Sequence, residues 1–194
     1  MKSMPSVAQP IVPFSTAAAF RRWLKTNHAK HHGIWMQLAK KDSGIASISY
    51  AEALDEALCY GWIDGQKKSY DAEYWLQKFT RRGPRSMWSR INIGHIERLT
   101  NEGRMQPAGQ AAVAAAKADG RWEQAYHSSS THELPADFLA AVSRHAKARA
   151  FFGTLNIANR YAIYFRLTTA RKPETRARRF EQLLGMLKRG EKLH

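Results

Sequence analysis

SYAEALDEALCYGWIDG, residues 49–65, combines the start of a helix, its end and the beginning of an extended segment. Ser49 followed three residues later by Glu52 is a capping box, which predicts that a helix begins there. Gly61 is the residue type that ends helices in left-handed backbone. Trp62-Ile63 then looks extended, and Asp64-Gly65 indicates a turn. A helix and a strand in such close succession predict a domain that mixes α and β structure.

Further elements are predicted on both sides of this segment. Residues 33–40 are apolar and short enough for a strand, and residues 74–79 form another. A helix over residues 17–29, capped by Ser15 or Thr16, precedes the first of these strands. We therefore expect a small, mostly antiparallel sheet accompanied by helices.

Everything after Pro84 is predicted to be helical. The expected helices cover residues 87–101, 107–119, 135 onward with Pro135 in the first turn, 145–153, 156–169 and 173 onward. The fold class is thus α+β, with a helical hairpin or bundle at the C-terminus. We expect a flexible arm over residues 1–13, an α+β core over 14–126, and a helical subdomain over 135–194 packed on that core.

Net charge and cysteine content narrow the function classes. The chain has 194 residues with 31 Lys and Arg against 16 Asp and Glu, a net charge of +15, of which residues 148–194 carry +8. Such a field attracts anionic ligands and polyanions. The single cysteine, Cys59, excludes an intrachain disulfide and favours a reducing compartment. With no apolar run of membrane-span length and no signal-peptide pattern, we predict a cytoplasmic protein.

Asp64, placed between Gly61 and Gly65, is the first candidate functional residue. Glycine on either side lets the backbone bend sharply and approach a ligand closely. The carboxylate could act as a general base or anchor a cation if its surroundings tune its pKa. The alternative is an Asx-turn or hairpin in which it binds its own backbone.

Arg81-Arg82-Gly83-Pro84-Arg85-Ser86 is the second candidate. Three guanidinium groups precede a predicted helix with Ser86 as its N-cap, an arrangement that favours anion binding. Trp88 could stack on a ring or on a guanidinium group. The alternatives are a basic loop paired with Asp64, Asp71 or Glu73, or a solvated one. Neither the glycine spacing nor the ending of a phosphate-binding loop is present.

The remaining clusters favour structural explanations. Residues 171–179 are rich in arginine and open the last helix, where they form a solvated basic face or hint at a bound anion. His28, His31 and His32 have a spacing suited to metal chelation, but no carboxylate or cysteine lies beside them. We therefore expect no metal and no cofactor.

Several motifs along the chain are distinctive as a set: EAL (residues 52–54), ALCYGWIDG (57–65), FTRR (79–82), SMWSRIN (86–92), EGRM (102–105) with Gly109, and ARKPETRARR (170–179). Together they resemble a known family, the YdeI/OmpD-associated or bacteriocin-protection-like proteins. The resemblance implies a role in resistance to bacteriocins or cationic antimicrobial peptides, a link to an outer-membrane porin and, for some members, a periplasmic location. It implies no catalytic residues, and it suggests that segments 61–65 and 81–92 belong to one feature.

The function we predict from the sequence is binding of a small anionic ligand or acidic partner, with a role in peptide resistance or envelope stress and without clear enzymatic activity. The candidate ligand-binding residues are Asp64, Arg81, Arg82, Arg85, Ser86, Trp88 and Asn92. One alternative is a nucleic-acid-binding protein that uses the Arg-rich C-terminal helix and residues 78–90. Another is an enzyme acting on an acidic metabolite with Asp64 as general base.

Overall fold

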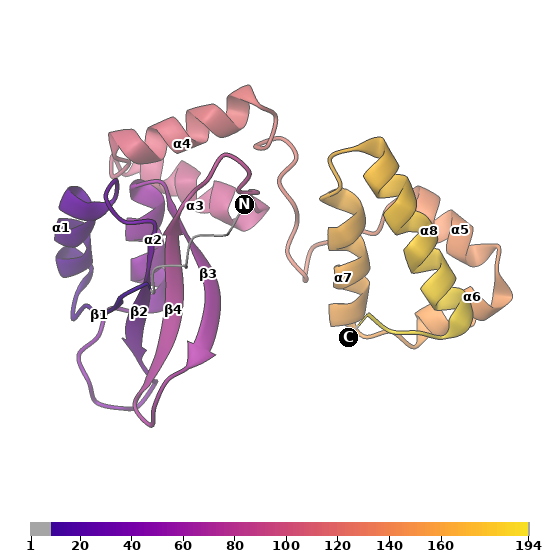
Figure 1. Cartoon of the computed structure of the whole chain (residues 1–194), viewed down its shortest axis with the longest axis horizontal. Coiled ribbons are helices and arrows are strands. Elements are labelled where there is room, and N and C mark those ends of the chain that lie inside the picture. The colour runs from indigo at the N-terminus through magenta and orange to yellow at the C-terminus, as the bar shows by residue number, and fades with distance from the viewer. Residues whose placement is uncertain (1–8, 194) are drawn as a thin grey trace, which may run out of the picture. The chain divides into compact units, whose positions relative to one another are not determined.

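The computed structural model describes residues 9–193 of the chain. They form four strands and eight helices, which divide into two compact units (Figure 1). The N-terminal unit consists of Met1–Met87 and Asn92–Glu123, and the C-terminal unit of Trp88–Ile91 and Gln124–His194. The predicted α+β class is confirmed.

The sheet of the N-terminal unit has the strand order β1-β2-β4-β3. Its strands are β1 (Ile11–Pro13), β2 (Gly33–Ala39), β3 (Trp62–Ser69) and β4 (Tyr74–Arg81). Strand β1 pairs with β2 in parallel, whereas β2 with β4 and β3 with β4 are antiparallel. The sheet is therefore mostly antiparallel, as predicted.

The predicted N-terminal arm differs from the structure at its end. Residues 1–8 lie outside the described residues, but Ile11–Pro13 form β1 instead of a loose segment. The Trp35 N–H donates to the Pro10 carbonyl over 2.9 Å and joins this segment to β2. An edge strand tolerates proline, because its outer N–H positions need no partner.

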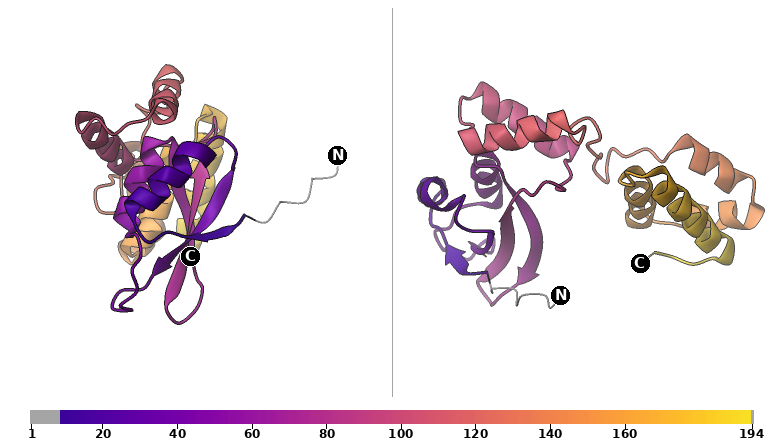
Figure 2. Two further views of the ribbon diagram at one scale, coloured as in Figure 1. Left: turned by 90° about the vertical axis from the view of Figure 1, so that its left-hand side faces the viewer. Right: turned by 45° about the horizontal axis from the view of Figure 1, so that its top comes forward.

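Helices α1 (Ala17–Asn27) and α2 (Tyr50–Cys59) pack on one face of the sheet (Figures 1 and 2). The ring of Phe20 on α1 lies 5.9 Å from Phe79 of β4, and Trp23 packs edge-on against Trp62 of β3 at 5.7 Å. Thr16 caps α1, and both hydrogen bonds of the predicted capping box at Ser49 are present. Gly61 ends α2 with φ of +72°, which confirms the predicted stop.

Helix α3 (Arg90–Asn101), from Asn92 onward, and helix α4 (Pro107–Ala118) complete the N-terminal unit. The backbone of α4 touches the end of α2 at Gly109, where an added Cβ would lie 2.2 Å from the carbonyl oxygen of Cys59. Glycine is required there because only a residue without a side chain permits such an approach.

Two local predictions in this unit are wrong. No turn occurs at Asp64-Gly65, because β3 continues to Ser69 with a bulge between Asp64 and Lys67, and the Gln77 amide donates to the Gly65 carbonyl over 2.9 Å. The predicted helix over 87–101 starts only at Arg90. Ser86 is not its N-cap, since the Ser86 hydroxyl accepts from the Gly83 N–H over 3.0 Å and closes a turn of its own.

The C-terminal unit is helical, as predicted. Its helices are α5 (Ala136–Ser143), α6 (Ala146–Gly153), α7 (Ile157–Thr168) and α8 (Pro173–Arg189). They enclose a core of their own that includes Phe138, Ile163 and Leu183. Pro135 is the N-cap residue of α5 and not its first helical residue. That the C-terminal subdomain packs on the α+β core stays a prediction.

Candidate functional site

Asp64 lies on β3 and is half-buried. Its carboxylate accepts a hydrogen bond of 2.8 Å from the hydroxyl of Tyr50, the first residue of α2. Burial of the phenol, together with this bond, raises the pKa of Tyr50 well above its ordinary value. Asp64 therefore binds a side chain of the neighbouring helix, and not its own backbone as in the Asx-turn alternative.

Two of the three predicted anion-binding arginines contact backbone carbonyls. Arg81 donates to the Ala29 carbonyl over 3.3 Å, and Arg82 donates to the Met87 carbonyl over 3.0 Å. Arg85 is exposed. Arginine side chains thus tie the loop after β4 to its surroundings.

Trp88 and Asn92 are the remaining predicted site residues. Trp88 is only 2% exposed and belongs to the C-terminal unit, so it offers no open ring for stacking, whereas Asn92 is half-buried in α3. Within residues 9–193, Asp64 forms no ion pair with an arginine. A shared pocket made by Asp64 and the arginine loop stays a prediction.

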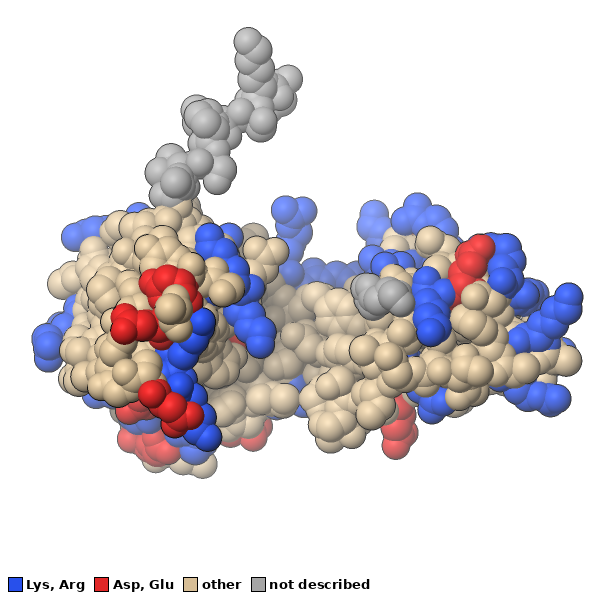
Figure 3. All heavy atoms as spheres, turned by 90° about the horizontal axis from the view of Figure 1, so that it is seen from below, with Lys and Arg blue, Asp and Glu red and all other residues tan. Residues whose placement is uncertain are grey.

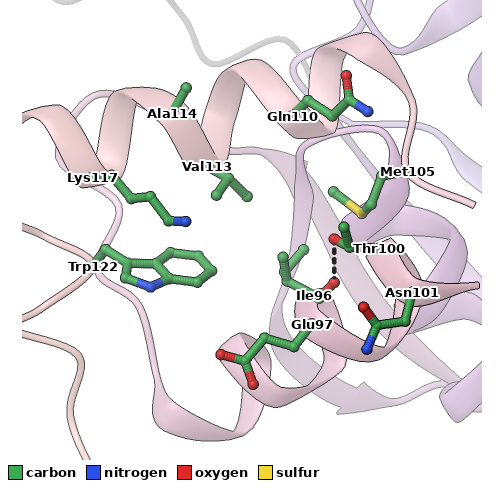
Figure 4. Close-up of a pocket in the computed structure, with 10 residues that line it drawn as sticks. All are labelled: Ile96, Glu97, Thr100, Asn101, Met105, Gln110, Val113, Ala114, Lys117 and Trp122. Atoms are coloured by element: carbon green, nitrogen blue, oxygen red, sulfur yellow. Dashed lines mark hydrogen bonds between the residues drawn. The ribbon is translucent and has the colours of Figure 1, made fainter. Parts of the chain in front are cut away.

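A pocket of about 610 Å³ lies between α3 and α4 in the N-terminal unit (Figure 4). It is lined by Ile96, Glu97, Thr100, Asn101, Met105, Gln110, Val113, Ala114, Lys117 and Trp122. The volume lies in the range of small-molecule sites, which are mainly apolar with a few polar groups. Half of the residues that line the α3–α4 pocket are apolar, and the other half are polar or charged.

The polar groups of the α3–α4 pocket differ in availability. The Lys117 ammonium lies 5.2 Å from the centre of the Trp122 ring, and both extend into the pocket (Figure 4). The Thr100 hydroxyl is occupied, because it donates to the Ile96 carbonyl over 2.7 Å. Lys117 forms no ion pair with Glu97 or any other carboxylate of the described chain. The site thus joins an indole face to an unneutralised cation.

Sequence reasoning missed this pocket. Residues 111–118 are rich in alanine, which has the highest intrinsic helix propensity and so indicates a helix without indicating a pocket. Small side chains on α4 leave space that larger ones would fill, and Met105 and Trp122 stand just outside the two ends of that helix. Alanines flanked by large apolar residues were the available signal.

A dense cluster of ion pairs, which we call the α2 charge cluster, holds the helices of this unit together. Its members are Arg21, Asp55, Glu56, His95, Arg98, Glu102 and Arg104. Glu56 is 1% exposed and accepts from Arg21 over 2.7 Å and from Arg104 over 2.9 Å. Hydrogen bonds from Arg98 and Arg104 lower the pKa of Glu102. Because these carboxylates are occupied by guanidinium groups, the cluster is structural.

Other candidate chemistry finds little support in residues 9–193. Burial raises the pKa of the Cys59 thiol to about 11, which disfavours the reactive thiolate. No group of three or more His, Cys, Asp or Glu within the described segment is arranged to hold a metal ion. None of the helices in that segment has the length and apolar character needed to cross a bilayer.

The comparisons with known proteins assign two families. Residues 12–112, just over half of the chain, match a domain of unknown function, DUF8412. Residues 131–190 match the family described as bacteriocin-protection, YdeI or OmpD-associated. No curated protein and no solved structure matches the chain.

The predicted family is confirmed, and the match to it covers the C-terminal helices. The motif over residues 170–179 lies inside that match, whereas the motifs between residues 52 and 109 lie in the segment matched by the domain of unknown function. The C-terminal match links the chain to a group of uncharacterised proteins named for bacteriocin protection. The chain belongs to the DUF8412 family, and its residues 131–190 match the family described as bacteriocin-protection, YdeI or OmpD-associated.

Proposed function

We propose that the N-terminal unit binds a small, flat apolar molecule that carries a negative charge, and that the α3–α4 pocket is its site. The observation that carries this proposal is the Lys117 ammonium placed beside the Trp122 ring in a pocket of about 610 Å³. An indole face and an apolar floor favour a flat ligand. An unneutralised ammonium favours an anionic group on it.

The charge of the whole chain supports an anion over a cation. A net charge of +15 raises the local concentration of anions around the protein. Glu97 and Lys117 are both exposed, so water screens the two charges alike. The single carboxylate of the pocket therefore opposes an anionic ligand only weakly.

The proposal is binding without turnover. The residues that line the pocket include no serine, cysteine or histidine, and the one hydroxyl, on Thr100, donates to the backbone of α3. Glu97 and Lys117 are the lining groups that could act as a general acid, base or nucleophile, and within the described residues neither side chain is hydrogen-bonded to a neighbour that would orient or activate it. The enzyme alternative with Asp64 as base would place the chemistry elsewhere, on β3.

The test uses two fluorescent probes with the same ring system. The probe 8-anilinonaphthalene-1-sulfonate carries a negative charge, and N-phenyl-1-naphthylamine carries none. A charge-assisted contact contributes about 1.5–3 kcal/mol to binding. We therefore expect Lys117→Met to lower the affinity for the sulfonate probe by about tenfold or more and to leave the affinity for the neutral probe unchanged. Val113→Trp fills the pocket and is expected to weaken both probes.

Two matched variants separate the α3–α4 pocket from other cations. Lys188→Met removes an exposed lysine of α8, and Arg85→Met removes an exposed arginine of the predicted anion loop. Both are expected to bind the two probes as the unaltered chain does. If Arg85→Met weakens the sulfonate probe while Lys117→Met does not, the site is the loop after β4 and the pocket assignment is overturned.

We further propose that ligand binding serves resistance to bacteriocins or antimicrobial peptides, as the name of the C-terminal family suggests. Expression of the chain in a sensitive bacterium is expected to raise survival under a cationic peptide such as polymyxin B. The Val113→Trp variant is expected to lose that protection at equal protein level. If cells that express the unaltered chain and cells that express Val113→Trp survive equally, the α3–α4 pocket is not needed for resistance.

A further inference from the structure

An open groove runs along α7 in the C-terminal unit. Its volume is about 710 Å³, and it is lined by Ser129, Ile157, Ala158, Tyr161, Ala162, Phe165 and Arg166. The residues from α7 recur at helical spacing, so they occupy one face of that helix. Ile163 and Leu167 on α7 belong to the core of the unit instead. Ile157 is 66% exposed, which shows that the groove face is not needed to bury that core.

Two aromatic rings line this α7 groove, and each contacts other rings of the C-terminal unit. Tyr161 stacks on Tyr164 with centroids 5.8 Å apart and an angle of 28° between the rings. Phe165 packs edge-on against Tyr126 at 5.1 Å. His132 contacts both Tyr161 and Tyr164, at 5.3 Å and 5.2 Å. Rings fixed in this way lose little conformational entropy when a planar group stacks on them.

Cations gather at the C-terminal end of the α7 groove. The Arg166 side chain lines the groove, and its own carbonyl accepts from Arg179 over 2.7 Å, which brings a second guanidinium to the same end of α7. Arg171 and Lys172 follow α7 directly and are exposed. Arg160 also lies on α7 but does not line the groove, since it donates to the Gly153 carbonyl over 3.3 Å and packs on the Phe152 ring.

Few carboxylates oppose these cations. Residues 124–194 contain 13 Lys and Arg but five Asp and Glu. In the described part of that segment, nine of the basic side chains form neither an ion pair nor a hydrogen bond: Arg144, Lys147, Arg149, Arg166, Arg171, Lys172, Arg178, Lys188 and Lys192. Figure 3 shows Lys and Arg over much of the visible face of the C-terminal unit, with little Asp or Glu between them.

We propose that the α7 groove binds single-stranded nucleic acid, with bases stacked on Tyr161 and Phe165 and phosphates held by Arg166 and the cations beside it. Four residues of helix separate the two rings by about 6 Å along the axis. This exceeds the 3.4 Å between stacked bases of a duplex and suits bases that are splayed apart. Stacking platforms with flanking cations are how proteins hold single strands without reading their sequence.

The experiment measures fluorescence anisotropy of a labelled 16-nucleotide oligothymidylate with the full chain. Log affinity is expected to fall linearly with log salt. Tyr161→Leu keeps an apolar side chain but removes the ring, and should weaken binding about fivefold or more. Tyr161→Phe keeps the ring and should bind as the unaltered chain does. Arg166→Gln should reduce the salt slope by roughly 0.7, the value for one phosphate contact.

Matched controls distinguish a site from general attraction. Lys188→Gln removes an equal charge that does not line the groove, and should change affinity less than Arg166→Gln. Far-UV circular dichroism checks that each variant keeps its helices. A thymidylate–adenylate duplex of equal length and vesicles of phosphatidylglycerol provide anionic surfaces without free bases.

Several results would overturn the proposal. Equal affinity of Tyr161→Leu and Tyr161→Phe would show that no base stacks there. An equal loss of affinity in Lys188→Gln and Arg166→Gln would show that net charge, and not the α7 groove, determines binding. Tighter binding of the duplex or of the vesicles would assign the surface to another kind of partner. If the chain does not bind the oligothymidylate at 50 mM salt, the nucleic-acid proposal is wrong.

Discussion

Arginine has different roles in the α2 charge cluster and on α7 and α8. In the cluster, Asp55 and Glu56 are each bound by guanidinium groups, and Arg98 reaches Asp55 over 2.6 Å. On the C-terminal unit, most described cations have no carboxylate partner. Arginine therefore holds helices together in one unit and remains available to a ligand in the other.

Burial explains the difference. A carboxylate that loses water must be paired, because an isolated buried charge costs several kcal/mol. Glu56 is 1% exposed and has two arginine partners. Cations such as Lys172 and Arg178 stay hydrated at the surface and need none. Net charge by itself does not separate these roles, whereas the position of each residue relative to a core does.

The largest expected effect comes from removing the buried member of the cluster. Glu56→Ala leaves Arg21 and Arg104 without their shared acceptor, and we expect it to lower the free energy of unfolding by about 3 kcal/mol. Urea titration followed by tryptophan fluorescence measures this, since five of the six tryptophans lie in the N-terminal unit. Glu181→Ala on α8 is the control, an exposed carboxylate without a described partner, and should change stability by less than about 0.5 kcal/mol. Similar losses of unfolding free energy in Glu56→Ala and Glu181→Ala would show that burial does not distinguish the two carboxylates.

The next effect is a loss of stability at alkaline pH that depends on Cys59. Burial, and secondarily Glu56, raise the pKa of its thiol from 9.0 to about 11. Between these values the unfolded chain releases the proton while the folded chain keeps it, so stability is complete below pH 9 and declines as the pH rises toward 11. The contribution is of the order of 2 kcal/mol.

Cys59→Ala provides the reference for this decline, since other groups titrate in the same range. We expect the unaltered chain to lose more stability between pH 9 and pH 11 than Cys59→Ala does. Parallel curves for the two chains would mean that the thiol is not shielded from water. Slow labelling of the native thiol by iodoacetamide at pH 8 is expected for the same reason.

Local signals in the sequence predicted much of the fold. The capping box at Ser49, the helix stop at Gly61 and the strand over residues 33–40 were all predicted. These features depend on residues close in sequence, whose hydrogen bonds are local. The helices of the C-terminal unit were found by their apolar periodicity for the same reason.

Long-range contacts account for two of the features that were missed, and a competing local turn accounts for a third. The Asp64-Gly65 pair suggested a turn, but pairing with β4 extends the strand through it. Ser86 had the residue type of an N-cap, yet its hydroxyl serves a local turn. The α3–α4 pocket depends on how Gly109 brings α4 against the end of α2. No spacing in the sequence encodes that approach.

A smaller effect, of opposite sign, is expected at the start of α8. Lys172 is the N-cap residue, has extended backbone and makes no side-chain cap. Lys172→Ser supplies a cap and removes a cation that opposes the helix dipole, so we expect the C-terminal unit to gain about 1 kcal/mol. Hydrogen exchange of α8 amides measures the gain. The same variant should bind the oligothymidylate less tightly, because it removes a cation at the end of the α7 groove. Weaker binding together with higher stability would show that Lys172 favours nucleic-acid binding and disfavours stability.

The smallest effect is expected at an ion pair that resembles those of the α2 charge cluster in length but not in burial. Arg176 and Asp137 approach to 2.8 Å, close to the 2.9 Å between Arg104 and Glu56. Their side chains are 36% and 53% exposed, whereas that of Glu56 is 1% exposed. Exposed pairs contribute about 0.2–1 kcal/mol, so Asp137→Asn should change the hydrogen exchange of α5 and α8 only slightly. A loss as large as that of Glu56→Ala would show that contact length, and not burial, determines how much an arginine–carboxylate pair stabilises this protein.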